Sequence, residues 1–176
     1  MKSTVITVSV IAAILVVIGI VKYNGIVEKE VAVERAWAPL LIKLKERYSP
    51  IPRMIVDITF YAAQKPPLAV ELESNRGKVE GADTISKRVD LANEIETDLM
   101  KLLQWVKERY PGIITGHPAG VMAQNLANTA AMMGPEMAVF NKAAADYNAY
   151  AQRFPNNIVA KLFGYPLTYS FFQPPN

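Results

Sequence analysis

The residue types that most often carry catalysis or bind metals are scarce in this chain. Its one histidine, His117, lies in the sequence Gly116-His117-Pro118, and there is no cysteine. A di-iron helical bundle needs several inward carboxylates with paired Glu-x-x-His motifs, which one histidine cannot supply. The chain also shows no glycine-rich phosphate loop and no motif that places a base beside a serine nucleophile. We therefore expect no metal, no cofactor and no enzymatic activity.

Three carboxylates close together in the sequence are the remaining candidates for acid–base chemistry. They are Glu94, Glu96 and Asp98. Paired carboxylates can act as general acid and base, but they must face each other. Residues two apart on a helix point in different directions. We interpret this group as part of a solvated helix face.

Positive charge gathers in one segment, at Lys43, Lys45, Arg47 and Arg53, where Glu46 opposes it. The net charge of the chain is +3, with both signs interspersed. This is far from the dense basic surface that binds nucleic acid phosphates, so we expect no nucleic acid partner. The four basic residues are either a solvated helix face or a contact for anionic lipid head groups or an acidic protein.

An unbroken apolar run near the start of the chain predicts a membrane anchor over residues 1–22. The run extends from Thr4 to Val21, 18 residues without a charged side chain, Asn, Gln, His or Pro. As a helix it would rise about 27 Å, close to the thickness of the bilayer hydrocarbon core. Lys2 and Lys22 flank it, so a charge can reach the head groups at each end.

Two other interpretations of the apolar run are open. A cleaved signal peptide has a shorter apolar core followed by small residues, whereas this run continues into Lys22-Tyr23-Asn24. A core helix of a soluble protein rarely extends so far without a polar residue. The run therefore indicates a retained, single-pass anchor, with signal cleavage as the alternative.

The charges that flank the run favour a cytoplasmic location for the rest of the chain. Lys22, Lys29 and Arg35 follow the run, against Lys2 and the α-amino group before it. Positive residues are retained on the cytoplasmic side. We expect the protein in the inner membrane or in an internal membrane derived from it.

Helical spacing of apolar residues predicts an all-α fold: the anchor, then an antiparallel bundle of about four long helices over residues 23–165. The first helix continues the anchor as one rod to Tyr48. Ser49 is expected to cap the second, which Lys65-Pro66-Pro67 interrupts and which resumes as far as Gly77. The third runs over residues 83–109, where Ile95 makes the apolar contact in place of Glu96.

The fourth helix carries the longest apolar stripe, and Gly134-Pro135 within it predicts a kink. Such a stripe, typical of a coiled coil, needs a partner helix to cover it. A short helix over 156–163 should end at Gly164. The stripe consists of Leu126, Ala130, Met133, Met137, Phe140, Ala144, Tyr147, Ala151 and Phe154.

The last segment, residues 166–176, is rich in aromatic residues and proline and should be extended. Its aromatic side chains are either exposed for a partner or folded back onto the bundle. With the residue that precedes the segment, the candidate contacts are Tyr165, Tyr169, Phe171 and Phe172.

Motifs near both ends of the soluble part match a known pattern. Near the anchor they are Tyr23-Asn24-x-Ile26-Val27 and Arg47-Tyr48-x-x-Ile51-Pro52. Near the end they are Asp146-Tyr147-Asn148 and the segment from Phe154-Pro155 to Phe163-Gly164-Tyr165. In these motifs the chain resembles the LemA family of bacterial membrane-anchored helical proteins. The resemblance implies an N-terminal transmembrane helix, a bundle of long helices and no established enzymatic activity.

This chain departs from the pattern of the family in two places. Apolar residues follow Thr129 where family members usually carry charges, and Lys65-Pro66-Pro67 replaces a continuous helix. If the family binds partners through those polar groups, this member should bind differently. Some relatives in magnetotactic bacteria serve magnetosome membranes, and nothing in the sequence separates that role from a general one.

An anchor joined to a bundle that has no catalytic motif indicates a scaffold or adaptor. It would engage an unknown membrane-associated protein, with tethering raising its effective concentration there. The alternative is a membrane-organising protein, such as one that forms magnetosome membranes, which acts as a homo-oligomer and through lipid contact.

Overall fold

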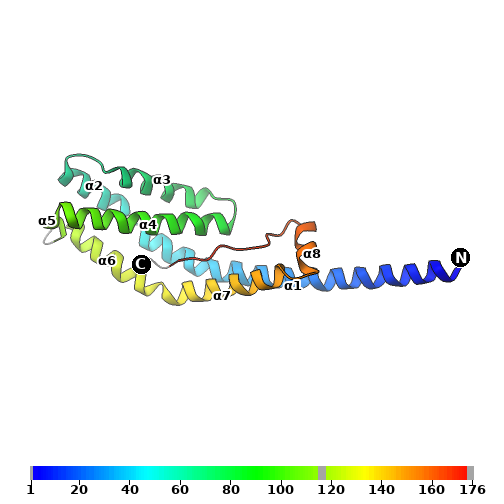
Figure 1. The fold of residues 1–176 in the computed structure, drawn as a ribbon. Coiled ribbons are helices and arrows are strands. Elements are labelled where there is room, and N and C mark those ends of the chain that lie inside the picture. The colour runs from blue at the N-terminus through cyan, green and yellow to red at the C-terminus, as the bar shows by residue number, and fades with distance from the viewer. Residues whose placement is uncertain (1, 115–117, 174–176) are drawn as a thin grey trace. The chain divides into compact units, whose positions relative to one another are not determined.

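The computed structural model describes residues 2–114 and 118–173, and the regular structure in these ranges is entirely α-helical. This confirms the predicted fold class. The single histidine, His117, lies outside the described residues. The helices are α1 Lys2–Tyr48, α2 Ile51–Ala62, α3 Pro67–Gly81, α4 Ile85–Arg109, α5 Pro111–Ile114, α6 Pro118–Met132, α7 Gly134–Ala151 and α8 Asn156–Leu162 (Figure 1).

The chain divides into two compact units. Unit 1 comprises Met1–Arg35 and Lys142–Tyr169, and unit 2 comprises Ala36–Asn141 and Ser170–Asn176. The division cuts across the segments 1–22, 23–165 and 166–176 expected from the sequence, because α1 and α7 each contribute to both units.

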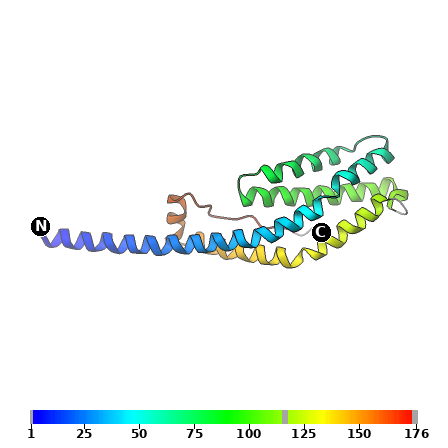
Figure 2. The same ribbon diagram turned by 180° about the vertical axis from the view of Figure 1, so that it is seen from behind.

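Unit 2 is a bundle in which α3 and α4 lie side by side, as both ribbon views show (Figures 1 and 2). α2 contacts α3 and α6, and α5 contacts α4 and α6. The predicted stripes meet in the core, where the ring of Trp37 lies 5.4 Å from that of Phe140. Burial of such side chains is the main source of stability in a bundle. The largest side chains fully buried in unit 2 include Leu40, Leu44, Ile51, Met54, Ile55, Ile58, Leu72, Ile95, Phe140 and Phe172.

The predicted rod is confirmed, since α1 is one helix of 47 residues. At Gly134-Pro135 the sequence predicts a kink within one long helix, and the structure has a full break there: α6 ends at Met132 and α7 begins at Gly134. Proline has no N–H to donate to the preceding turn, so the chain cannot continue α6 unbroken.

Several predicted helix ends are wrong in detail. Ser49 does not cap α2, because its hydroxyl donates back to the carbonyl of Glu46 at 2.9 Å and Pro50 occupies the cap position. α3 passes through Gly77 and ends at Gly81, since a single exposed glycine costs a helix only about 1 kcal/mol. The predicted end of α8 is confirmed, with Gly164 at φ 77° just beyond it.

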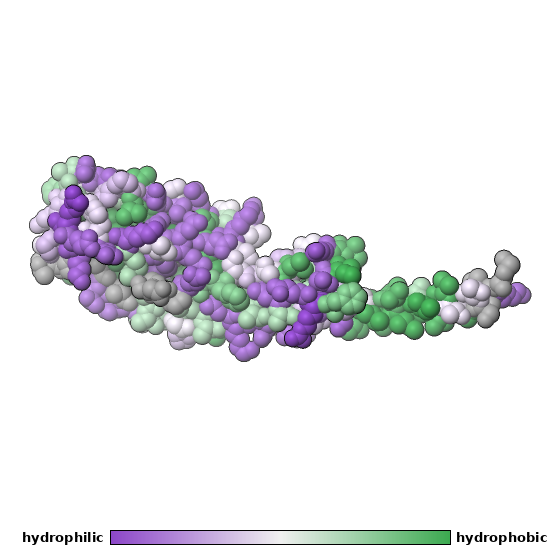
Figure 3. Space-filling view, in the orientation of Figure 1, coloured by the Kyte–Doolittle hydropathy of each residue, from purple (hydrophilic) through white to green (hydrophobic). Residues whose placement is uncertain are grey.

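Unit 1 pairs the first part of α1 with the second part of α7. A Cβ atom at Gly25 would clash with the hydroxyl oxygen of Tyr150, so glycine permits the two helices to approach closely here. In front of this contact, α1 carries an 18-residue window of mean hydropathy 2.4, none of it buried. Figure 3 shows that end of α1 as a hydrophobic surface. By length and composition the helix can cross a membrane.

Candidate functional site

The basic residues singled out in the sequence do not form one exposed cluster. Lys43 and Lys45 lie at the surface, paired with Glu46 at 3.1 Å and Glu80 at 3.5 Å. Arg53 is exposed, with its Nε 3.2 Å from a carboxylate oxygen of Asp57.

Arg47 is buried, which corrects the interpretation that all four basic residues share a solvated face. Its Nε donates to Glu96 Oε1 at 2.7 Å, and its Nη2 donates to Oε2 at 2.6 Å. Both side chains are only 2% exposed. This two-point contact is the strongest geometry available to an arginine and a carboxylate.

The remaining guanidinium nitrogen of Arg47 is also satisfied. Nη1 donates to the backbone carbonyl of Leu126 and, at 3.1 Å, to Thr129 Oγ1. Arg47 therefore joins α1 to α4 through Glu96 and to α6 through Leu126 and Thr129. All of these partners belong to unit 2, so the pair links three helices in the core of that bundle.

The carboxylates predicted to form a solvated face are split by the structure. Glu94 is exposed, whereas Glu96 and Asp98 are buried, so the interpretation is wrong for the latter two. Asp98 Oδ1 lies 3.6 Å from Lys101 Nζ. Among the described residues, no group of His, Cys, Asp and Glu is arranged to hold a metal ion.

Tyr48 lies beside the buried pair and donates from its hydroxyl to the carbonyl of Ala92 at 3.3 Å. Burial, with a further contribution from the negative charge of Glu96, raises the pKa of Tyr48 well above its usual value. Burial likewise raises the pKa of Tyr147 and of Tyr169 in unit 1. A hydrogen bond with Tyr23 leads the causes that raise the pKa of Tyr165 to about 12.

The raised pKa values of these four tyrosines predict that the protein loses stability at alkaline pH. Because their pKa is higher in the folded state than the value of about 10 in an unfolded chain, folding retains their protons. The stabilisation is complete below about pH 10 and is lost as the pH rises above it. In a near-ultraviolet titration, Tyr48, Tyr147, Tyr165 and Tyr169 should ionise late in the folded protein. Tyr48→Phe should remove one late tyrosine, and a single step near pH 10 for all of them would contradict the prediction.

The aromatic segment near the end of the chain is held by asparagine side chains. In unit 1, Asn148 Oδ1 accepts from the N–H of Tyr169 at 2.7 Å and its Nδ2 donates to the carbonyl of Tyr169 at 2.9 Å. In unit 2, Asn141 holds Phe172 in the same two-point way, at 2.8 and 2.7 Å. The side-chain amide thereby replaces the neighbouring strand that an extended backbone usually needs.

A third asparagine completes this arrangement in unit 2. Asn93 donates to the carbonyl of Phe171 at 2.9 Å and accepts from the N–H of Gln173 at 2.8 Å. The described part of the segment, residues 166–173, contains no helix or strand. Tyr169 and Phe172 are buried, so they are not available at the surface, whereas Phe171 is exposed and Tyr165 half-buried.

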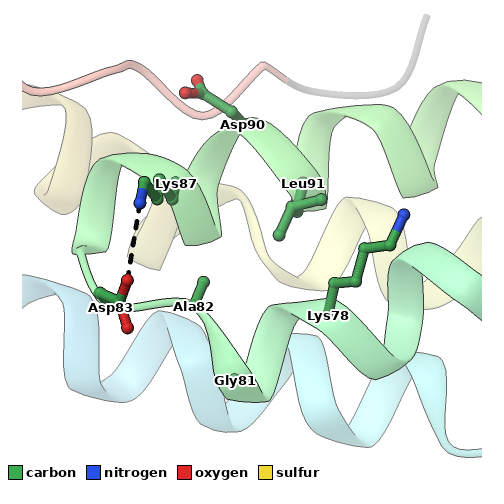
Figure 4. A pocket seen from close by; sticks show the side chains of 7 residues that line it. All are labelled: Lys78, Gly81, Ala82, Asp83, Lys87, Asp90 and Leu91. Carbon is green, nitrogen blue, oxygen red and sulfur yellow. Dashed lines mark ion pairs between the residues drawn. The ribbon is translucent and has the colours of Figure 1, made fainter.

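A small-molecule site would need a cavity, and the one between the ends of α3 and α4 is open to solvent. It has a volume of about 530 Å³ (Figure 4). Its charged side chains include Asp83 and Lys87, which pair with each other at 3.6 Å. Leu91 projects into the hollow, while Asp90 points away from it (Figure 4). Nothing in this hollow selects one ligand chemistry.

The comparison with protein families gives one result. The model described as the LemA family matches residues 36–175, which include all of unit 2 except Asn176. The match begins after the apolar run and after Tyr23-Asn24. No curated protein matches the chain.

Proposed function

This chain belongs to the LemA family, and we propose that it acts as a non-enzymatic scaffold or adaptor, anchored in the membrane by the first part of α1. The fold and the family agree with a membrane-associated helical protein. The scaffold role goes beyond that membership, and the following paragraphs give its support.

The observation that carries the proposal is the contrast between the two parts of α1. The window that could cross a membrane is not buried at all, while Trp37, Leu40 and Leu44 of the same helix lie in the core of unit 2. Exposing a long apolar surface to water is unfavourable, and a bilayer removes that cost. A helix shared by an anchor and a folded bundle suits a protein that holds a surface near a membrane.

The surface best suited to a protein partner lies on α2. Arg53, Val56 and Phe60 follow one another at helical spacing on its exposed face, and Phe60 is 84% exposed. Aromatic side chains flanked by arginine are typical of the centres of protein interfaces. Lys43 and Lys45 lie at the surface of α1 in the same unit, each paired with a carboxylate, so the apolar and aromatic side chains of α2 carry the proposed contact.

The basic residues that follow the apolar run, Lys22, Lys29 and Arg35, support a cytoplasmic location for the two units. Protease treatment of intact cells tests this side of the proposal. Protection of the bundle in intact cells, and its digestion after lysis, is the expected result. Digestion in cells whose inner membrane is intact would contradict it.

Photo-crosslinking in native membranes tests the partner. A photoreactive amino acid at position 60 should yield a covalent adduct with another polypeptide, and Val56→Ser in the same chain should reduce that adduct. The same group at Lys107, an exposed charged position on α4, is the matched control. An adduct of twice the mass of the chain would instead support self-association in a membrane-organising protein. No adduct at position 60 beyond that at position 107 would contradict the use of this face.

A further inference from the structure

The short helix α8 in unit 1 has an inverted polarity. Its buried face consists of Asn156 and Ala160, a polar and a small residue. Its exposed face carries Ile158 and Leu162, and Leu162 is 76% exposed. Phe154, just before the helix, is 80% exposed. A helix in contact with water normally shows the opposite arrangement, so the exposed face of α8 is suited to an apolar environment.

The position of α8 within unit 1 identifies that environment. The ring of Phe163, at the end of α8, lies 4.7 Å from the ring of Tyr23. Tyr23 is two residues beyond Val21, the last residue of the apolar run, so it lies roughly 3 Å further along α1. The interfacial layer of a bilayer is about 5–8 Å deep on each side. If the run spans the bilayer, α8 lies at the level of the lipid head groups.

The charges at this end of unit 1 match an anionic surface. Residues 149–169 contain Arg153 and Lys161 but no Asp or Glu. Both side chains are exposed, and Lys22 lies on α1 directly after the apolar run. Lys161 falls on the same side of α8 as Ile158 and Leu162, where its long stem can extend along the apolar side chains toward phosphate groups.

We infer that α8 is an interfacial membrane helix: Phe154, Ile158 and Leu162 enter the boundary between acyl chains and head groups, while Arg153 and Lys161 contact anionic lipid phosphates. This inference rests on the proposed anchoring by α1. Figure 3 shows hydrophobic surface on α8 itself, next to the apolar part of α1. Helices of this kind lie in the plane of the interface with their apolar face buried about 5–10 Å. The unit would then contact the membrane at two places, which fixes how it is held there.

Spin-label accessibility in vesicles tests the inference, and the absence of cysteine makes the labelling specific. The full chain is reconstituted in vesicles of phosphatidylcholine and phosphatidylglycerol, with a nitroxide attached after Leu162→Cys or Ile158→Cys. Leu15→Cys reports on the apolar run. Glu34→Cys lies thirteen residues beyond Val21, roughly 20 Å along α1, and serves as the aqueous control.

The expected result is that the labels at positions 158 and 162 are more accessible to oxygen than to a water-soluble nickel complex. The label at position 15 should behave in the same way, and the label at position 34 should be more accessible to the nickel complex. Changing Arg153 and Lys161 together to Gln should shift both labels toward water in anionic vesicles and not in neutral ones. If 15 is in lipid while 158 and 162 behave like 34, the inference is wrong and the anchor stands. If 15 is aqueous, the anchoring itself fails and the inference with it. Labels at 158 and 162 shielded from both reagents would show a protein partner on this face, which also overturns the lipid contact.

Discussion

Replacing Arg47 by methionine is expected to lower the free energy of unfolding by about 3–5 kcal/mol. The substitution leaves the carboxylate of Glu96 only 2% exposed and without its two guanidinium donors. A buried charge without a partner is unfavourable, because it has lost its hydration and no ion pair compensates for that loss. Chemical denaturation of the full chain in mild detergent, followed by far-ultraviolet circular dichroism, measures the loss.

A double-mutant cycle of Arg47 and Glu96 separates the energy of their ion pair from the energy of packing. Glu96→Leu alone should be similarly costly because it strands the guanidinium of Arg47. The double variant should be much less destabilised than the sum of the two, since hydrophobic replacement of a whole buried pair is often neutral or better. Lys87→Ala is the matched surface control: its pair with Asp83 is exposed and should contribute nothing measurable. Additive losses in the double variant would show that the two residues do not act as a pair.

Much of the fold could be predicted from the sequence because the apolar stripes are long and regular. In the stripe that runs from Leu126 to Ala151, every position but Ala130 is buried, and Ala130 is half-buried. Only Phe154 departs, being exposed after α7 has ended. The spacing of apolar residues predicts which face of a helix is buried. Here the prediction holds on both sides of the break at Met133.

The Arg47–Glu96 link could not be predicted from composition, but the sequence carries a signal for it. Arg47 follows Leu40 and Leu44 at the same alternation of four and three residues, and Glu96 stands between Ala92 and Leu99 in the same way. Two opposite charges at stripe positions of different helices are candidates for a buried pair. The basic residues close to Arg47 in the sequence, Lys43, Lys45 and Arg53, suggest a surface position for it instead. The register that brings α1 against α4 depends on packing over the whole unit, which local patterns do not encode.

The contacts of the final segment were beyond sequence reasoning for a related reason. Asparagine is common on exposed helix faces, and its type alone does not indicate a partner. Asn141 and Asn148 are seven residues apart on α7, so they lie on one side of that helix, and each holds one tail residue at two points. The reason for asparagine at these two positions becomes clear only once the position of the final segment is known.

Arginine at both Ile11 and Leu15 is expected to abolish stable membrane residence. The apolar run contains 12 Val, Ile and Leu residues. Each favours insertion by about 0.3–0.6 kcal/mol at the helix centre, so together they contribute roughly 4–7 kcal/mol at most. Each central arginine costs about 2.5–3.5 kcal/mol, so two of them offset nearly the whole driving force. The protein should move from the membrane pellet to the supernatant after an alkaline carbonate wash, which strips peripheral proteins. Ile42→Arg with Val56→Arg, at exposed apolar positions of unit 2, should leave the pellet fraction unchanged. Retention of the first double variant at the level of the unmodified chain would mean that something other than this run holds the protein in the membrane.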